Sequence, residues 1–561
     1  TFKMTHNQKT KYGITDSEIK FQSILDSVES GFDLPDQVCP HCGEDMTKDG
    51  HSIPFETFLG FKGDKVPDID LNFSGDYQGV VHEYIRELFG HDRAFRAGTI
   101  STVAAKTAFG YVKGYVERKN VTLRKAEIER RASKIAGVKR STGQHPGGIV
   151  VVPNYKEIID VTPIQFPADV TTSSWKTTHF DYHSFEDNLF KLDVLGHDDP
   201  TMIKFLIDYV QKHPLEFPFS EAKEIPLDDK NVYKLLNSTD IIGLTREDLN
   251  SDVASFGIPE MGTSFVREML KDSRPSTFAE LVKISGLSHG TDVWLNNAKS
   301  LVTGKIPQFG KIPFKQVIGC RDDIMVFLIE SGLKNDVAFE IAEFIRKGRP
   351  SREKDAWDGY KLIMKEHKIP EWYAWSCGKI KYMFPKAHAT AYVMMAMRIA
   401  WFKLYKPILF YAAYFSKRAS DFDVYALQGG EYTITKKMNQ IEEKGKKASE
   451  TEKRQYTVLE IALEMVKRGF SFKPIDINVS LAREFKIDEE EKALILPFIT
   501  VDQLGLKVAN SIIVARAEKE FGSKEDIKER TSLSTSLFTK LEMLDVFEGM
   551  PENSQLNLFE I

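Results

Sequence analysis

The chain has 561 residues, of which 42% are hydrophobic and 28% are charged, and its formal net charge is -5. This length is more than one hydrophobic core supports, so about three or four domains are expected, and the near-average composition excludes wholesale disorder. The most apolar run, residues 389–402, is short and is broken by Arg398, which excludes a membrane span. The four cysteines predict no disulfide framework and a reducing compartment, by default the cytoplasm.

Residues 1–54 form a polar insert punctuated by glycine and proline. Cys39 and Cys42 have the spacing of half a zinc knuckle, but a structural Zn²⁺ site needs four ligands and no second Cys-x-x-Cys is present. The other ligands would be nearby histidines or residues outside this sequence, and the alternative is two inert thiols. The candidate histidines are His6, His41 and His51.

A strand over residues 66–73 would place Asp68 and Asp70 on one face and apolar residues on the other. Residues 190–195 repeat this arrangement once, with Asp193 as the acidic residue. Three carboxylates on two adjacent strands could hold a pair of divalent ions, although Asp-x-Asp alone is also typical of a solvated edge strand. The residues expected on the buried faces are Ile69, Leu71, Phe73, Phe190, Leu192 and Val194.

A basic block separates these two strands. Its apolar residues recur at three- and four-residue steps, so we predict a small helical subdomain over residues 99–138. The block could track phosphates, or it could be a solvated helical face. The segment 143–148 predicts a turn into a buried strand over 149–153. The basic residues are Arg96, Lys106, Lys113, Arg118, Lys119, Arg124, Lys125, Arg130, Arg131, Lys134, Lys139 and Arg140, against Glu117, Glu127 and Glu129.

From about residue 201 to 418 the sequence is mostly helical. The Gly-marked segment 319–323 contains Arg321, a residue type that suits a triphosphate cradle, although such segments are more often capped helix starts. On a helix, His388 and Tyr392 would share a face next to Lys386. That face could meet a nucleotide base and its phosphates, or it could pack on a neighbouring helix.

Two features mark the end of the chain. A short β-rich piece around residues 494–501 is followed by residues 504–513, which resemble a helix-hairpin-helix whose backbone amides can hold a duplex phosphate. The final residues include exposed apolar side chains that usually await a groove, unless the end folds back on its own domain. These tail residues are Gln555, Leu556, Asn557, Leu558 and Phe559.

With these segments in order, the chain closely resembles the catalytic C-terminal region of the PolC type of bacterial DNA polymerase III, a C-family polymerase. The resemblance runs from about Gly31 to the end. The segments that carry it are 31–35, 55–70, 142–148, 192–200, 286–294 and 382–389.

The resemblance implies an α+β multidomain fold with a mixed-sheet palm of the polymerase-beta type, a helical thumb insert and large helical fingers. It implies that Asp68, Asp70 and Asp193 bind two Mg²⁺ ions. Arg321, Lys386 and His388 become candidates for contacting the incoming nucleotide, with Arg321 and Lys386 nearest its phosphates. The implied domains are an N-terminal insert (1–54), two palm segments (55–95 and 143–200), a thumb (96–142), fingers (201–425), a duplex-binding region with a helix-hairpin-helix (426–550) and a clamp-binding tail (551–561).

The function implied is template-directed DNA synthesis from dNTPs on primer-template DNA, with a sliding clamp bound through Gln555, Leu556, Leu558 and Phe559. No exonuclease is expected in this chain, and the first part of the palm, a PHP domain and an exonuclease would belong to an upstream polypeptide. The family's first Cys-x-x-Cys is absent. Two alternatives remain, a truncated non-catalytic fragment that binds duplex DNA and clamp, and a two-metal nuclease.

Overall fold

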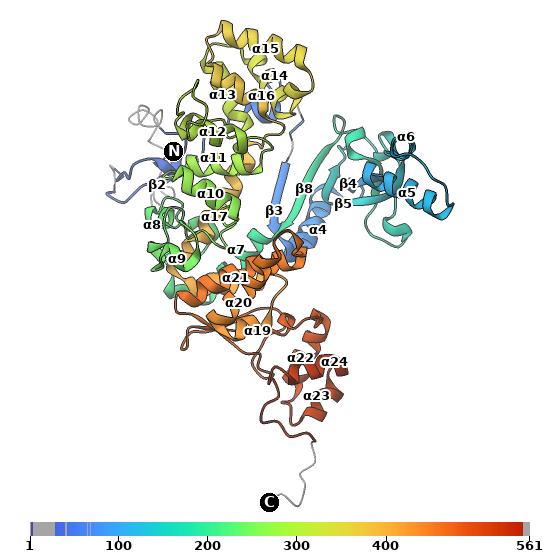
Figure 1. Cartoon of the computed structure of the whole chain (residues 1–561), viewed down its shortest axis with the longest axis vertical. Coiled ribbons are helices and arrows are strands. Elements are labelled where there is room, and N and C mark those ends of the chain that lie inside the picture. Colours follow the sequence, from blue (N-terminus) through green and yellow to red (C-terminus); the bar gives the residue numbers. More distant parts are fainter. Residues whose placement is uncertain (1, 4–27, 40–41, 64–65, 68, 554–561) are drawn as a thin grey trace, which may run out of the picture. The chain divides into compact units, whose positions relative to one another are not determined.

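The computed structural model describes residues 2–3, 28–39, 42–63, 66–67 and 69–553 (Figure 1). Asp68 and the four tail residues Gln555, Leu556, Leu558 and Phe559 therefore lie outside the described residues. The chain divides into two compact units. We call residues 55–201 the sheet unit, and residues 1–54 together with 202–561 the helical unit.

A six-stranded mixed sheet forms the sheet unit, in the spatial order β3-β8-β5-β4-β7-β6. The outer pair β3 and β8 is parallel, β5 runs antiparallel to both β8 and β4, and β7 lies parallel to β4 and antiparallel to β6. The strands are β3 (Ile69–Ser74), β4 (Ala94–Thr102), β5 (Lys139–Val151), β6 (Ile164–Gln165), β7 (Thr177–Asp181) and β8 (Phe190–His197). The helices are α3 (Glu56–Leu59), α4 (Gln78–Phe89), α5 (Ala105–Arg118) and α6 (Lys125–Ile135).

The apolar faces predicted for the two acidic strands are confirmed. Side chains of β3, β4, β5 and β8 form one hydrophobic cluster with Val81 and Ile85 of α4, because successive residues of a strand point to opposite faces. A second cluster, which includes Phe95, Val150 and Phe185, is built from residues of β4, β5, the β5–β6 connection and the β7–β8 connection. The strand residues of the first cluster are Ile69, Leu71, Phe73, Ala94, Ile149, Val151, Phe190, Leu192 and Val194.

The helical insert lies at the end of a long ribbon formed by β4 and β5, as Figure 1 shows. Its helices α5 and α6 pack through a small core that includes Val103, Ala108, Val112 and Ala132. The prediction of helix from residue 99 was wrong for its first residues, since β4 continues to Thr102 through pairing with β5.

The turn predicted over residues 143–148 was also wrong. These residues belong to β5, because β4 supplies backbone partners along this stretch, and the glycines of the segment serve close packing instead of a turn.

The helical unit is mainly α-helical, as the sequence predicts for residues 201–418. The residues preceding the sheet unit also belong to it: the Asp33 carboxylate accepts hydrogen bonds from the backbone N–H groups of Phe278 (2.6 Å) and Ala279 (3.0 Å) at the start of α11. The helices are α7 (Asp198–Lys212), which begins in the sheet unit, α8 (Lys230–Lys234), α9 (Arg246–Leu249), α10 (Ser264–Ser273), α11 (Phe278–His289), α12 (Lys299–Val302), α13 (Arg321–Glu330), α14 (Asn335–Arg346), α15 (Lys354–Glu366), α16 (Glu371–Lys379), α17 (Lys386–Tyr405), α18 (Pro407–Lys417), α19 (Val424–Gln428), α20 (Gly430–Lys444) and α21 (Glu450–Lys467).

A buried ion pair ties three of these helices together. Lys403 of α17 and Glu464 of α21 have fully buried side chains whose charged atoms lie 2.8 Å apart. The Tyr411 hydroxyl of α18 donates to Oε1 of Glu464 (2.6 Å), and Arg468 donates to the Tyr411 hydroxyl (3.1 Å). Because each charge has a partner, this polar group is tolerated in an apolar core.

The chain then forms a three-stranded sheet and a further helical segment. The sheet has the order β10-β11-β9, and the expected β-rich piece around 494–501 contains only β11 and a 3₁₀ turn. No helix among the described residues is long and apolar enough to cross a bilayer. The remaining elements are β1 (Phe2–Lys3), β2 (Thr47–Lys48), β9 (Ser471–Lys473), β10 (Lys486–Asp488), β11 (Ala493–Ile495), α22 (Leu506–Glu518), α23 (Lys524–Arg530) and α24 (Thr535–Glu542).

Candidate functional site

Asp70 and Asp193 are brought together by the parallel pairing of β3 and β8. They are direct register partners, and register partners on neighbouring strands project from the same face of a sheet. Gly148 of β5 is the register partner of Asp193 on its other side, so across β3, β8 and β5 this row carries only the two carboxylate side chains. The row lies on the face of the sheet opposite the hydrophobic cluster that contains Val81 and Ile85 of α4.

The Asp193 carboxylate is nearly buried and only partly satisfied. Its Oδ2 lies 2.8 Å from the ammonium group of Lys191, two residues earlier on the same strand face, while its Oδ1 has no hydrogen-bond partner. The Lys191 ammonium also lies 4.7 Å from the centre of the Tyr182 ring. The alternation that predicts the position of Asp193 also places Lys191 beside it, but the sequence analysis did not select this lysine.

His145 lies beside Asp193 without bonding to it. Its Nδ1 is 3.5 Å from Asp193 Oδ1, but the same nitrogen accepts the backbone N–H of Gly148 (2.6 Å) and therefore carries no proton to donate. Burial lowers the pKa of His145, and the charges of Lys191 and Arg96 act in the same direction against the opposing charge of Asp193. His145 is therefore neutral here, and Asp193 Oδ1 keeps an unused lone pair in a buried place.

Gly147 lets β5 approach β8 closely beside this row, because a Cβ there would lie 2.6 Å from the Val194 carbonyl oxygen. At Gly148 an added Cβ would lie 2.8 Å from Nδ1 of His145, within β5 itself. Arg96 fixes the same part of β5 by donating to the carbonyl oxygens of His145 (3.0 Å) and Pro146 (2.8 Å). Arg96 therefore binds backbone carbonyl groups of β5, although the sequence analysis grouped it with the residues of the basic block.

The donor set of this row fits a divalent cation. Two carboxylates project from adjacent strands, and one of them offers a buried oxygen with no donor, while Mg²⁺ requires oxygen ligands. Within the described ranges, no three His, Cys, Asp or Glu side chains are grouped so that they could hold a metal ion. Asp68, the expected third carboxylate, is outside those ranges.

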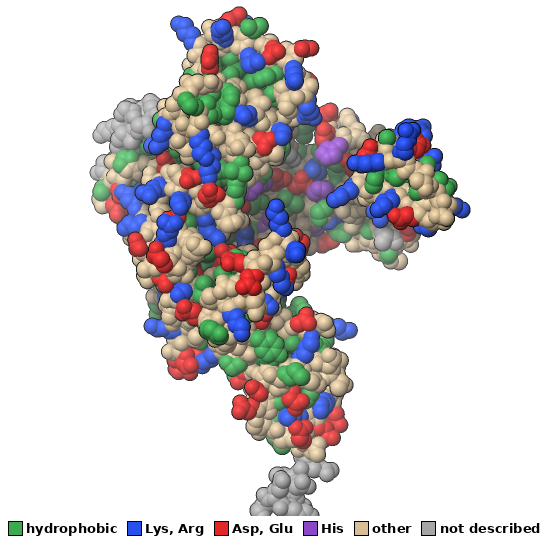
Figure 2. Space-filling view, in the orientation of Figure 1, with side chains coloured by type: hydrophobic (Ala, Val, Ile, Leu, Met, Phe, Trp, Pro, Cys, Tyr) green, Lys and Arg blue, Asp and Glu red, His purple; other side chains and the backbone are tan. Residues whose placement is uncertain are grey.

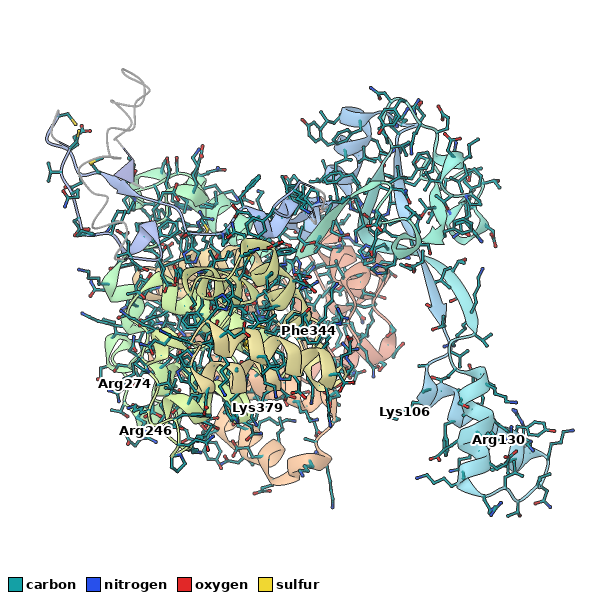
Figure 3. The ribbon with its side chains drawn as sticks, turned by 90° about the horizontal axis from the view of Figure 1, so that it is seen from above. Lys106, Arg130, Arg246, Arg274, Phe344 and Lys379 are labelled. Atoms are coloured by element: carbon teal, nitrogen blue, oxygen red, sulfur yellow. The ribbon has the colours of Figure 1, made fainter. Side chains whose placement is uncertain are left out.

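The α5–α6 pair presents an exposed basic surface. Figure 2 shows blue side chains over this pair, and Figure 3 shows Lys106 on α5 and Arg130 on α6. Some of the charge is matched along the helices, for example between Arg130 and Glu127. Tyr111 and Tyr115 on α5 are each 49% exposed, so aromatic rings accompany the cations.

In the helical unit, Arg321 and Lys386 lie at the starts of two helices that meet. The Arg321 backbone N–H donates to the Phe384 carbonyl (3.3 Å), and the Lys386 backbone N–H donates to the Asp322 carboxylate (2.8 Å). The Arg321 guanidinium is buried and bonds to Glu343 (3.2 Å) and Asp322 (3.3 Å).

The Lys386 ammonium lies 3.5 Å from the Asp323 carboxylate. Burial alone would lower the pKa of Lys386, but the negative charges of Asp323 and Glu29 outweigh it and raise that pKa. Burial likewise favours a higher pKa for Asp323, yet Lys283, Lys386 and two backbone donors lower it. Both groups are therefore charged, and sequence reasoning missed these carboxylate partners because they depend on tertiary packing.

His388 lies in the first turn of α17, two residues after Lys386, and packs between two rings. Its ring centre is 4.4 Å from that of Phe384 and 4.6 Å from that of Tyr392. The predicted proximity of His388 and Tyr392 is thus observed. The contact is an aromatic cluster at the start of α17, close in sequence to Lys386.

Cys39 is buried and Cys42 is exposed, with the Gly43 N–H closing a turn onto the Cys39 carbonyl (3.0 Å). No further ligand joins them among the described residues, and His51 is packed against Phe278 with a ring-centre distance of 5.9 Å. The described residues thus supply two thiols of a knuckle and do not complete a zinc site.

Three family profiles match the sequence. "Bacterial DNA polymerase III alpha NTPase domain" matches residues 25–125 and 110–196, "Bacterial DNA polymerase III alpha subunit finger domain" matches 199–368, and "Helix-hairpin-helix motif" matches 469–556. The last match covers α22 to α24 and confirms the predicted helix-hairpin-helix. The first covers the whole Asp70–Asp193 row.

Curated relatives match almost the entire chain. A protein named "DNA polymerase III PolC-type" from Oceanobacillus iheyensis is 55% identical over 533 residues, and those from Bacillus subtilis and Listeria monocytogenes are each 54% identical over 536 and 533 residues. Each match covers 95% of this chain but 36% of the relative. The chain therefore spans about a third of the length of these relatives.

Proposed function

The chain belongs to the PolC-type family of bacterial DNA polymerase III, and we propose that it carries the catalytic centre of a template-directed DNA polymerase. The observation that carries this proposal is the register pairing of Asp70 with Asp193. The reaction is attack of a primer 3′-hydroxyl on the α-phosphate of a dNTP, with release of pyrophosphate. In this assignment the sheet unit contains the palm (55–95 and 143–200) and the thumb (96–142).

Asp68, Asp70 and Asp193 are the proposed ligands of two Mg²⁺ ions. Bound there, the ions would supply charge neutralisation at the phosphates and a lower pKa of the attacking hydroxyl. Asp193 contributes the buried Oδ1, whose lone pair no protein donor uses. Lys191 keeps Asp193 in place and offsets part of its charge, and the strand pairing fixes the spacing of both carboxylates.

Arg321, Lys386 and His388 are the proposed contacts of the incoming nucleotide in the fingers, residues 201–425. Arg321 and Lys386 would replace some of their contacts with carboxylates by contacts with triphosphate oxygens. Both cations lie beside helix N-termini, and helix N-termini favour bound anions. His388 would present its aromatic cluster to the base.

The exposed basic pair α5–α6 and the helix-hairpin-helix are proposed to hold duplex DNA, the latter within residues 426–550. We assign the tail 551–561, with Gln555, Leu556, Leu558 and Phe559, to a sliding clamp. An upstream polypeptide would complete the palm and supply PHP and exonuclease domains. Zn²⁺ at Cys39 and Cys42 would need ligands beyond the described residues.

The test is incubation of the chain with Mg²⁺ and a 5′-labelled primer annealed to a longer template, with and without the matching dNTP. Extension only with the dNTP supports the proposal. Primer shortening without dNTP would identify a two-metal nuclease instead. Unchanged primer with retained duplex binding would identify a non-catalytic binding fragment.

A further inference from the structure

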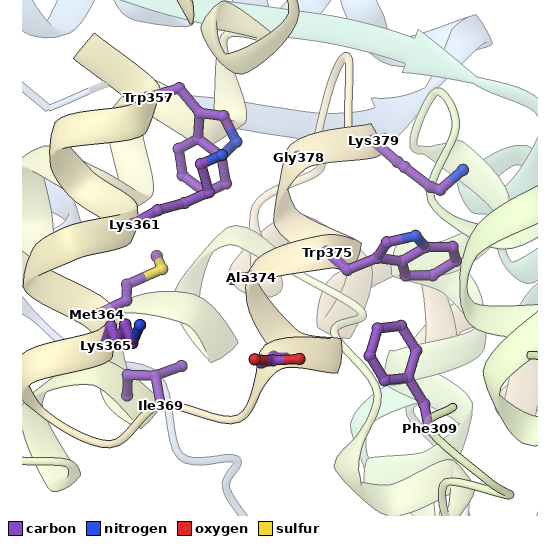
Figure 4. A pocket seen from close by; sticks show the side chains of 11 residues that line it. Phe309, Trp357, Lys361, Met364, Lys365, Ile369, Ala374, Trp375, Gly378 and Lys379 are labelled. Carbon is purple, nitrogen blue, oxygen red and sulfur yellow. The ribbon is translucent and has the colours of Figure 1, made fainter. Parts of the chain in front are cut away.

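A cavity of about 520 Å³ opens on the helical unit between α15 and α16. Figure 4 shows its walls: Trp357 and Lys361 reach from α15 on one side, and Trp375 of α16 lies beside Phe309 on the other. Ala374 and Gly378, small residues one turn apart on α16, lie between these aromatic walls. The volume is within the range of pockets that hold small organic groups.

The aromatic walls are set by close contacts. Phe309 and Trp375 meet edge to face with ring centres 5.7 Å apart. A Cβ on Gly378 would lie 3.2 Å from Trp357 Nε1, so glycine here lets the indole lie close to α16. Trp357 is held firmly, with 8% of its surface exposed. The cavity thus offers preformed aromatic surfaces, with the small residues Ala374 and Gly378 between them.

The charge of the cavity is positive at its rim. Three of the lining residues are lysines, Lys361, Lys365 and Lys379, and Glu371 is the one acidic residue among the lining side chains. The Lys379 ammonium lies 4.5 Å from the centre of the Trp375 ring. Lys361 pairs with Asp358 at 2.6 Å, but both side chains are largely exposed, so this pair is easily exchanged for another anion.

We propose that this cavity binds single-stranded DNA, with one unpaired base between the aromatic walls and the flanking phosphates on the rim lysines. Aromatic rings stack on any base, and lysines follow the backbone charge, which is the chemistry of sequence-tolerant single-strand binding. The choice of DNA as the anionic ligand rests on the proposed polymerase function. A paired base is unsuitable, because it cannot leave its stack to enter the cavity without being flipped.

The test measures binding of a fluorescent oligothymidylate of about twenty nucleotides and of an abasic oligomer of equal length and charge. The full chain should prefer the oligothymidylate. Trp375→Ala should weaken that binding about fivefold to a hundredfold, the loss expected for one base–aromatic stack. Trp375→Phe should recover much of it, and Trp372→Ala, on the same helix but outside the cavity lining, should change it less than about twofold.

The rim lysines allow a second measurement, the salt dependence of binding. This dependence should not change if the lysines have only a structural role. Lys361→Gln combined with Lys365→Gln should make the slope of log affinity against log salt shallower by about 0.7 for each phosphate that the chain no longer neutralises. Lys234→Gln on α8 is the matched control and should leave the slope unchanged. Ultraviolet crosslinking of an iodouracil-containing strand should join it to Phe309, Trp357 or Trp375.

Equal affinity for the abasic oligomer, equal weakening by Trp372→Ala and Trp375→Ala, or crosslinks only elsewhere would overturn the proposal. So would full competition by polyglutamate at matched charge, which would identify an acidic peptide site. The two proposals can fail separately. If primer extension is intact and Trp375→Ala has no effect on oligothymidylate binding, only the cavity proposal is rejected. If extension is absent and Trp375→Ala has the expected effect, only the polymerase proposal is rejected.

Discussion

Asp70 on β3 and Asp193 on β8 are register partners across a parallel strand pair, with Gly148 of β5 on the far side of Asp193. The pairing fixes two carboxylates side by side without relying on a loop. The close approach of β5 to β8 also explains Gly147, because a Cβ there would meet the Val194 carbonyl oxygen of β8.

Gly147→Ala should loosen the site. Its Cβ would lie 2.6 Å from the Val194 carbonyl oxygen and the Leu195 side chain, so β5 and β8 must separate, at a cost of about 1–3 kcal/mol for overpacking. Amide hydrogen exchange in β5 and β8 should accelerate accordingly.

Gly110→Ala is the matched control for this substitution. Gly110 lies in α5, where an added Cβ meets nothing within 4 Å, so alanine should stabilise that helix by about 0.5–1 kcal/mol. Unchanged exchange in β5 and β8 of Gly147→Ala would show that the close strand approach is not required.

Lys403→Met should be strongly destabilising, because it leaves the buried Glu464 charge without its partner. The expected loss is about 3–5 kcal/mol, and the double variant Lys403→Met with Glu464→Leu should recover a large part of it. Thermal unfolding of the helical unit measures this.

Lys453→Met removes one member of the exposed pair with Glu450 and is the control for the buried pair. It should change the free energy of unfolding by less than about 0.5 kcal/mol. A similar small effect of Lys403→Met would contradict the buried ion pair.

His51 should make the fold sensitive to acid. Burial lowers its pKa from 6.5 to about 4, with a further contribution from the charge of Lys386, and neither ring nitrogen has a hydrogen-bond partner. Because the folded-state pKa is below the unfolded one, the unfolded chain takes up the proton first as pH falls from about 6.5 to 4. Stability should therefore decline over that window, and it should decline less in His51→Phe.

Nuclear magnetic resonance titration gives the direct measurement. The His51 ring should titrate near pH 4 in the folded chain, and Lys386→Met should raise that pKa because it removes a nearby positive charge. A His51 pKa at the ordinary value of 6.5 would contradict the buried position.

The sequence was sufficient to predict the two acidic strands. The alternation of polar and apolar residues around Asp70 and Asp193 indicates the face of the sheet to which each side chain points. It failed at residues 143–148, where glycines usually signal a turn but here permit close strand packing. It could not reveal that Glu343 and Asp323 hold Arg321 and Lys386, because those contacts join residues through tertiary packing that periodicity does not encode. The contact of Lys191 with Asp193 follows from strand alternation and was overlooked.

Incorporation of one correct dNTP in Mg²⁺ tests the central claim most directly, with Asp70→Asn and Asp193→Asn compared against the unaltered chain. Asp92→Asn, an exposed carboxylate in the same unit, is the control for the charge change. The account predicts incorporation by the unaltered chain and by Asp92→Asn, and a loss of about a hundredfold or more in the other two, since metal ligation supplies several kcal/mol. Undiminished incorporation by Asp193→Asn would contradict it.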